Sequence, residues 1–141
     1  MGKTMKKTKI CLRTTGPEQS EEIIAQADCV FSEKGNVYTF AEAGVRYTVT
    51  VGRAASIARE GEISYFLLLS EKGDVPTEMK TPYGTIPFFV RSHGIALSAN
   101  AGRTVFEAEY SLVFSGEERR HKILFEADAP ADENAFTENR K

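Results

Sequence analysis

The sequence predicts an all-β protein whose single domain is an up-and-down antiparallel β-barrel of about 8–10 strands. Nine of the 11 glycines recur across residues 35–116, and most intervals between them are eight to twelve residues long. That spacing is typical of hairpin turns, where glycine accepts positive φ angles that other residues resist. β-Branched and aromatic residues fill the segments between these glycines. Strands joined by consecutive short hairpins can form one of two architectures, a closed barrel or two packed sheets. The long predicted strands favour the barrel.

The first two strands are expected at residues 8–15 and 21–33, after a flexible start at residues 1–7. Apolar and polar residues alternate along the second strand, which indicates one buried face and one solvated face. The buried face is predicted to consist of Ile23, Ala25, Ala27, Cys29 and Phe31.

The next predicted strands are residues 36–42, 45–51, 53–59 and 63–70. Residues 53–59 are rich in alanine, a poor strand former, but the glycines on either side enclose them too tightly for a stable helix. Residues 63–70 are apolar on both faces. We therefore expect the outer side chains of Phe66 and Leu68 to be covered by another segment or by a partner subunit.

The C-terminal half predicts strands at residues 77–81, 85–92, 95–100, 103–115 and 118–127, with a short hairpin around His93. Pro87 cannot donate a ladder hydrogen bond and predicts an edge or a bulge. In residues 103–115 the inward face is predicted to be Phe106, Ala108, Tyr110, Leu112 and Phe114. The barrel domain is thus expected at residues 8–127, followed by a disordered acidic tail at 128–141.

Composition excludes several classes of protein. The net charge is −2, from 18 basic and 20 acidic residues, so no strongly positive face is expected for a nucleic acid. The basic start precedes too short an apolar run for a signal peptide, and no run is long enough to span a bilayer as a helix. We expect a cytoplasmic protein in which Cys11 and Cys29 are reduced.

The run Lys80-Thr-Pro-Tyr-Gly-Thr-Ile-Pro87, followed by the strand Arg103-Thr-Val-Phe-Glu-Ala-Glu-Tyr110-Ser-Leu112, resembles the YwiB-type bacterial domain of unknown function. The resemblance extends over about residues 8–127 and includes Glu42, Gly44 and Tyr47-Thr48. It implies a calycin-like, or lipocalin-like, β-barrel and brings no catalytic residues. The sequence departs from the family pattern after Phe40, where the loop is shortened to residues 41–45.

Tyr83 is the first candidate binding residue. Its aromatic ring could stack on a ligand at the barrel mouth, or it could pack over a barrel corner formed by Gly84 at positive φ. The other candidate ligand-binding residues, which are expected to face the interior, are Phe31, Phe106, Ala108 and Tyr110.

No catalytic or metal-binding motif is present in the sequence, so we expect neither an enzyme nor a cofactor. His93 and His121 have no carboxylate or thiol at ligand spacing. A basic group could form an anion patch if its strands are close, although such residues are more often a solvated strand face. This group is Arg91, Arg119, Arg120 and Lys122.

The function favoured by the sequence is binding of a small, mainly apolar molecule inside the barrel, without catalysis, since a barrel of about eight strands can enclose one small ligand. The alternative is a packed barrel that serves as a structural or interaction module and forms a homodimer through the outer face at Phe66 and Leu68. A cavity of about 300 Å³ or more would favour the first.

Overall fold

The computed structural model describes residues 5–32, 35–70, 73–100 and 103–128 of the chain, and it confirms a single closed, antiparallel barrel. Ten strands follow one another around the barrel, and β1 pairs with both β2 and β10 to close it. The strands are β1 (Met5–Thr15), β2 (Ser20–Ser32), β3 (Gly35–Glu42), β4 (Val45–Val51), β5 (Ala55–Glu60), β6 (Ser64–Leu69), β7 (Asp74–Thr81), β8 (Gly84–Asn100), β9 (Arg103–Phe114) and β10 (Glu117–Ala127).

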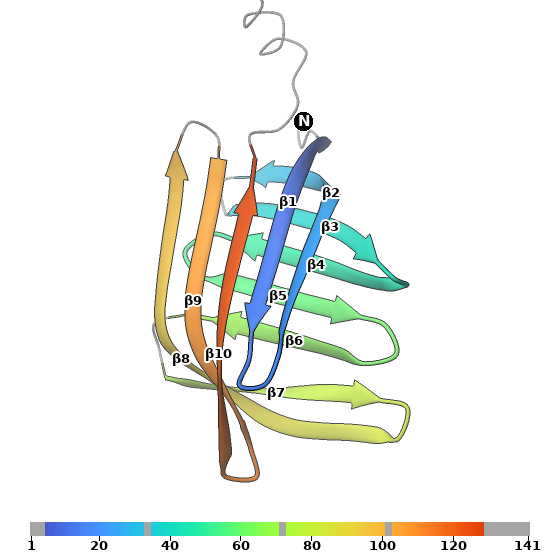
Figure 1. Ribbon diagram of the computed structural model, residues 1–141, viewed down its shortest axis with the longest axis vertical. Helices are drawn as coiled ribbons and strands as arrows, with labels where there is room; N and C mark the ends of the chain where they lie inside the picture. The colour runs from blue at the N-terminus through green and yellow to red at the C-terminus, as the bar shows by residue number, and fades with distance from the viewer. Residues whose placement is uncertain (1–4, 33–34, 71–72, 101–102, 129–141) are drawn as a thin grey trace, which may run out of the picture.

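The barrel is flattened into two layers whose strands cross (Figure 1). Strands β1, β2, β9 and β10 run along the long axis of the molecule, whereas β3 to β7 run across it behind them. The long strand β8 belongs to both layers, because its first half pairs with β7 and its second half pairs with β9. A sheet that changes direction in this way needs a bend in the shared strand.

Strand β8 contains a β-bulge between Ser92 and Gly94. There Gly94 pairs with Glu109 on β9, whereas His93 has no partner residue on that strand. The predicted hairpin around His93 is therefore wrong, since residues 84–100 form one strand. The extra residue keeps Ser92 and Ile95 on the inner face, opposite Tyr110 and Ala108. Glycine marks bulges as well as turns, so the sequence could not distinguish the two.

Pro87 faces no partner on β9, because the β8–β9 ladder begins at Phe89. At Pro87, the side of β8 that faces away from β7 is therefore a local sheet edge, as predicted for a residue without an N–H group. The alanine-rich segment is strand β5, as predicted. Strand β1 begins at Met5, where it pairs with Val30, so the ladder starts before the predicted boundary at residue 8.

The core fills the interior with the side chains that the alternation predicts. Phe106 and Phe125 are completely buried, and Tyr38 packs edge-on against Phe125 with 5.0 Å between ring centroids. The Tyr38 hydroxyl donates to Thr104 at 3.1 Å, which satisfies a polar group inside the core. On the outside of β6, Phe66 is 48% exposed, so none of the described residues buries it.

The two layers are joined unevenly. Strand β2 pairs with β3 only from Asp28 to Ser32, and β6 pairs with β7 at only two positions. The barrel is thus closed tightly at the end where β1 begins and β10 ends, and more loosely at the other end (Figure 1).

The backbone N–H of Asp128 donates to Lys9, so this residue continues from β10 against β1. Of the start predicted to be flexible, residues 1–7, residues 5–7 belong to β1 and residues 1–4 lie outside the described residues, as does the rest of the predicted tail, residues 129–141. Within the described ranges, no helix has the length and hydropathy needed to cross a membrane.

Candidate functional site

Two adjoining cavities lie between the layers at the loosely closed end of the barrel. The outer cavity has a volume of about 350 Å³ and the inner one about 230 Å³. They share a wall that consists of Thr14, Glu21, Tyr65, Leu67 and Tyr110. The outer volume exceeds the size at which a drug-sized molecule can be accommodated.

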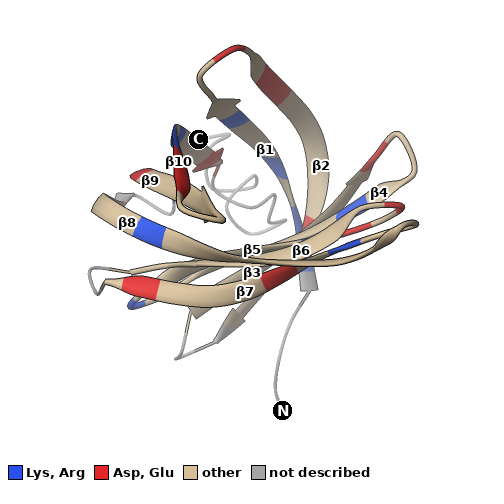
Figure 2. Ribbon diagram, turned by 90° about the horizontal axis from the view of Figure 1, so that it is seen from below, with Lys and Arg blue, Asp and Glu red and all other residues tan. Residues whose placement is uncertain are grey.

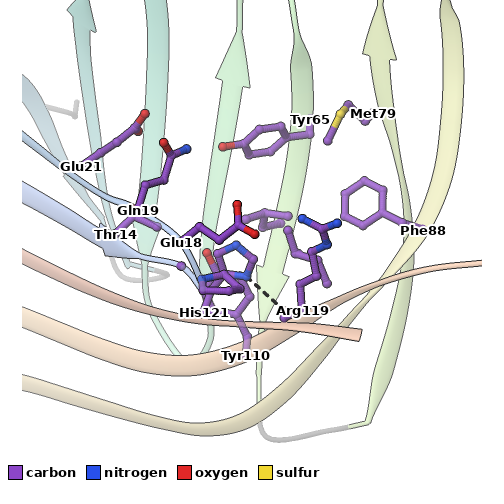
Figure 3. A pocket seen from close by; sticks show the side chains of 14 residues that line it. Thr14, Glu18, Gln19, Glu21, Tyr65, Met79, Phe88, Tyr110, Arg119 and His121 are labelled. Atoms are coloured by element: carbon purple, nitrogen blue, oxygen red, sulfur yellow. Dashed lines mark hydrogen bonds between the residues drawn. The ribbon is translucent and has the colours of Figure 1, made fainter. Parts of the chain in front are cut away.

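Strand alternation explains which side chains reach the outer cavity. Tyr110 on β9 is paired with His121 on β10, so both rings project into the interior from neighbouring strands. Tyr65 and Leu67 come from β6 in the opposite layer. The remaining apolar lining side chains are Met79, Phe88 and Leu112, which Figure 3 shows in part beside Tyr65.

The turn between β1 and β2 forms the rim of the outer cavity. Gly16 donates its N–H to the carbonyl of Gln19 at 2.8 Å, which closes the turn. A Cβ atom at Gly16 would lie 3.1 Å from Cδ2 of His121, so only glycine allows the turn to approach this ring without displacing it. The turn also contributes Pro17 and Glu18 to the lining.

His121 is the best-defined polar group in the outer cavity. Its ring stacks on Tyr110 with 5.5 Å between centroids and 14° between planes. Nδ1 lies 3.1 Å from the Arg119 carbonyl, which can only accept, so Nδ1 carries the proton (Figure 3). Burial lowers the pKa of His121, although the Arg119 carbonyl opposes the shift. At neutral pH the ring is therefore uncharged, and Nε2 presents a lone pair.

Charges of both signs border the outer cavity. Arg119 contacts Glu117 at 3.9 Å, a weak ion pair between side chains that are 55% and 70% exposed. Glu18 and Arg119 both line the outer cavity (Figure 3). The lining of the outer cavity is consequently mixed in polarity.

The predicted binding residues fall in different places. Tyr110 is 3% exposed and borders both cavities, in agreement with its predicted inward direction. Phe106 and Ala108 also face inward but belong to the packed part of the core, as does the partly buried Phe31. None of these three lines either cavity.

Tyr83 is 98% exposed at the tip of the β7–β8 hairpin and borders neither cavity. Its N–H donates to the Thr81 hydroxyl at 3.0 Å, and that hydroxyl donates to the Gly84 carbonyl at 2.8 Å. Gly84 has the predicted positive φ of 136°. The Thr-Pro-Tyr-Gly segment is therefore a hairpin turn, and the predicted packing of the Tyr83 ring over a barrel corner is wrong, because the ring is exposed.

The basic residues do not form an anion patch. Arg91 binds Asp74 through two hydrogen bonds of 2.9 and 3.0 Å and also binds Glu118. Arg120 and Lys122 share Glu109 on the outer face, whereas Arg119 lines the cavity. Figure 2 shows acidic and basic segments interspersed along the strands.

Ser111, His93 and Glu118 meet on the outer face of the barrel, which the sequence spacing did not indicate. Nε2 of His93 lies 2.7 Å from the Ser111 hydroxyl and 3.5 Å from Glu118. The Ser111 hydroxyl donates to Glu118, and this bond lowers the pKa of the carboxyl group. Ser111 thus contacts both the His93 ring and the Glu118 carboxylate. Ser111 is also completely buried.

The described residues contain no group of three or more His, Cys, Asp or Glu side chains that could hold a metal ion. Cys11 and Cys29 are both free thiols, as expected. Burial raises the pKa of the Cys29 thiol to about 11, so this cysteine behaves as a small core residue.

Comparison with known proteins gives a likeness of fold. No protein-family model and no curated protein matches the chain. The crystal structure of the YwiB protein from Bacillus subtilis is similar, with a TM-score of 0.76 and 8% sequence identity. The match covers 90% of this chain and 94% of that protein. This chain therefore has a barrel fold like that of YwiB, in agreement with the resemblance seen in its sequence.

Proposed function

We propose that the protein binds one small molecule in the cavities at the loosely closed end of the barrel, without catalysis. The main support for this proposal is the outer cavity, which has a volume of about 350 Å³ and lies beside the packed core without being filled by side chains. Apolar side chains from both layers offer contact area, and a few polar groups offer orientation. This combination is typical of small-molecule sites. We place the protein in the cytoplasm, in keeping with its free thiols.

An environment-sensitive hydrophobic dye tests this proposal. The folded protein should bind the dye at one saturable site, measured by fluorescence titration. Met79→Trp should weaken binding at least tenfold, because the larger ring occupies the outer cavity. The matched control is Ile24→Trp, since Ile24 is 57% exposed on the outer side of β2. Equal dye binding by wild type and Met79→Trp would contradict the proposal.

A second candidate function is favoured by the outer surface. Phe66 and Phe89 are about half exposed, and a depression of about 510 Å³ lies over β5 to β7 beside Phe66. Such a surface is suited to a homodimer or another protein partner. Phe66→Glu should then convert a dimer to a monomer, measured by sedimentation. A wild-type protein that is monomeric at high concentration would exclude the homodimer.

A further inference from the structure

Four of the residues that line the inner cavity carry hydroxyl groups. Tyr47, Tyr65 and Tyr110 reach it from β4, β6 and β9, and Thr14 reaches it from β1. The remaining lining consists of two charged residues, Glu21 and Arg59, and the aliphatic residues Leu12, Ile23, Ile57, Leu67 and Ile123. Hydroxyl groups both donate and accept hydrogen bonds, so this set is suited to either kind of partner.

The Tyr110 hydroxyl is the most informative of these groups. Only 3% of the surface of Tyr110 is exposed. Even so, its hydroxyl makes no hydrogen bond within the described residues. Among these residues, no fully enclosed side-chain nitrogen or oxygen lacks a partner, so this hydroxyl is reached from the cavity. Leaving a buried hydroxyl unpaired costs free energy, which a bound water or a ligand atom would recover.

The second ring of the pair, Tyr65, is arranged in the same way. It borders both cavities from the opposite layer, and its hydroxyl also makes no hydrogen bond within the described residues. Burial raises the pKa of both tyrosines, and both rings line the two cavities from opposite layers. Two neutral donors thus face a common space at the junction of the cavities.

The charges beside the inner cavity disfavour a charged occupant. Arg59 is already engaged, with Nη1 donating to the Ile63 carbonyl at 3.1 Å and the guanidinium 6.0 Å from the Tyr65 ring centroid. Glu21 borders the same space and would repel an anion. The other cation, Arg119, borders only the outer cavity. A neutral hydrogen-bonding group is the occupant that this cavity stabilises best.

We infer that the ligand is a small amphipathic molecule that binds with its polar end innermost. A neutral hydroxyl or carbonyl group lies against Tyr65 and Tyr110 in the inner cavity. The apolar body fills the outer cavity against Met79, Phe88 and Leu112. This inference rests on the proposed function and adds the chemical class and the orientation of the ligand.

Three probes that share one ring system test the inference: 2-naphthol, 2-methylnaphthalene and 2-naphthoate. Their affinities for the full-length protein are measured by following amide chemical shifts to saturation. In wild type, 2-naphthol should bind with the hydroxyl against Tyr110. Tyr110→Phe should lower the affinity ratio of 2-naphthol to 2-methylnaphthalene by about three- to tenfold, the worth of one neutral hydrogen bond.

Tyr65→Phe is the second variant and should lower the same ratio, which keeps the test valid if Tyr110→Phe does not fold. Tyr83→Phe is the matched control, because that ring is 98% exposed and away from both cavities. It should leave the ratio unchanged.

The outcomes separate the inference from the proposed function. Binding of the neutral probes with a ratio that neither tyrosine variant changes would overturn the inference and leave the cavity as a binding site. Tightest binding of 2-naphthoate, lost in Arg119→Gln, would also overturn it, because the polar end would then lie in the outer cavity. Failure of all three probes to bind would contradict the proposed function and, with it, the inference.

Discussion

Ala108 lies in the densely packed part of the barrel and is 3% exposed. Ala108→Leu adds volume where none is free, so we expect it to lower the free energy of unfolding by about 1–3 kcal/mol. Urea denaturation measures the change, and dye binding under native conditions should be retained. Ala96→Leu is the control, because Ala96 is exposed on the neighbouring strand. Unchanged stability together with lost dye binding would place the ligand beside Ala108 instead.

Gly84 has a φ of 136°, and a Cβ atom there would meet nothing within 4 Å. Gly84→Val should therefore destabilise through backbone strain alone, by about 1–3 kcal/mol in the free energy of unfolding. Gly94→Val is the matched control on the same strand, since Gly94 also has open space but no positive φ. Equal stability of the two variants in thermal unfolding would show that the turn carries no strain.

His121, which lines the outer cavity, should make the stability of the protein depend on pH. Its pKa is lowered in the folded protein, so the unfolded chain binds more protons between the two pKa values. The stability that neutral His121 provides is present above its ordinary pKa of about 6.5 and is lost as the pH falls below that value. His121→Gln should consequently lose less stability than wild type between about pH 7 and pH 5. An equal loss in both proteins, measured by denaturant titration, would contradict the assignment of a neutral buried ring.

At the scale of elements, the bend in β8 is held by ion pairs that span three strands. Arg91 on β8 binds Asp74 on β7 and Glu118 on β10. The guanidinium lowers the pKa of Asp74, so this stabilisation is lost as the pH falls through the lowered pKa. Arg91→Gln should lower the thermal midpoint at low salt and much less in about 1 M NaCl, because salt screens exposed charges. A loss that does not depend on salt would mean that packing, not charge, holds the bend.

Most strands could be predicted from the sequence, because alternation of apolar and polar residues has a clear period. Strand β9 shows this, since Phe106, Ala108 and Tyr110 all face inward as predicted. The bulge at His93 could not be predicted, because a glycine after a polar residue is equally typical of a turn. The cavity could not be located either, since its position depends on how the two layers cross and not on any one strand.

At the scale of the whole molecule, function depends on the difference between the two ends of the barrel. One end is closed by complete ladders and filled by aromatic side chains, and the other is held by short ladders around two cavities. Tyr110 was the one predicted binding residue that reaches these cavities, because it lies nearest the loosely closed end of β9. Arg119 and His121 are separated from the buried residues of β10 by an even number of positions, and their side chains therefore point to the same inner face. This alternation could have identified them as candidate binding residues from the sequence.

Intermolecular nuclear Overhauser effects test the central claim, that the double cavity is the binding site, most directly. With 2-naphthol bound to protein labelled at its methyl groups, the ring protons of the probe should show effects to the methyl groups of Met79 and Leu112, which line the outer cavity. Effects to Leu68 on the outer face of β6 would contradict the claim, because the probe would then occupy the apolar surface instead of the barrel interior.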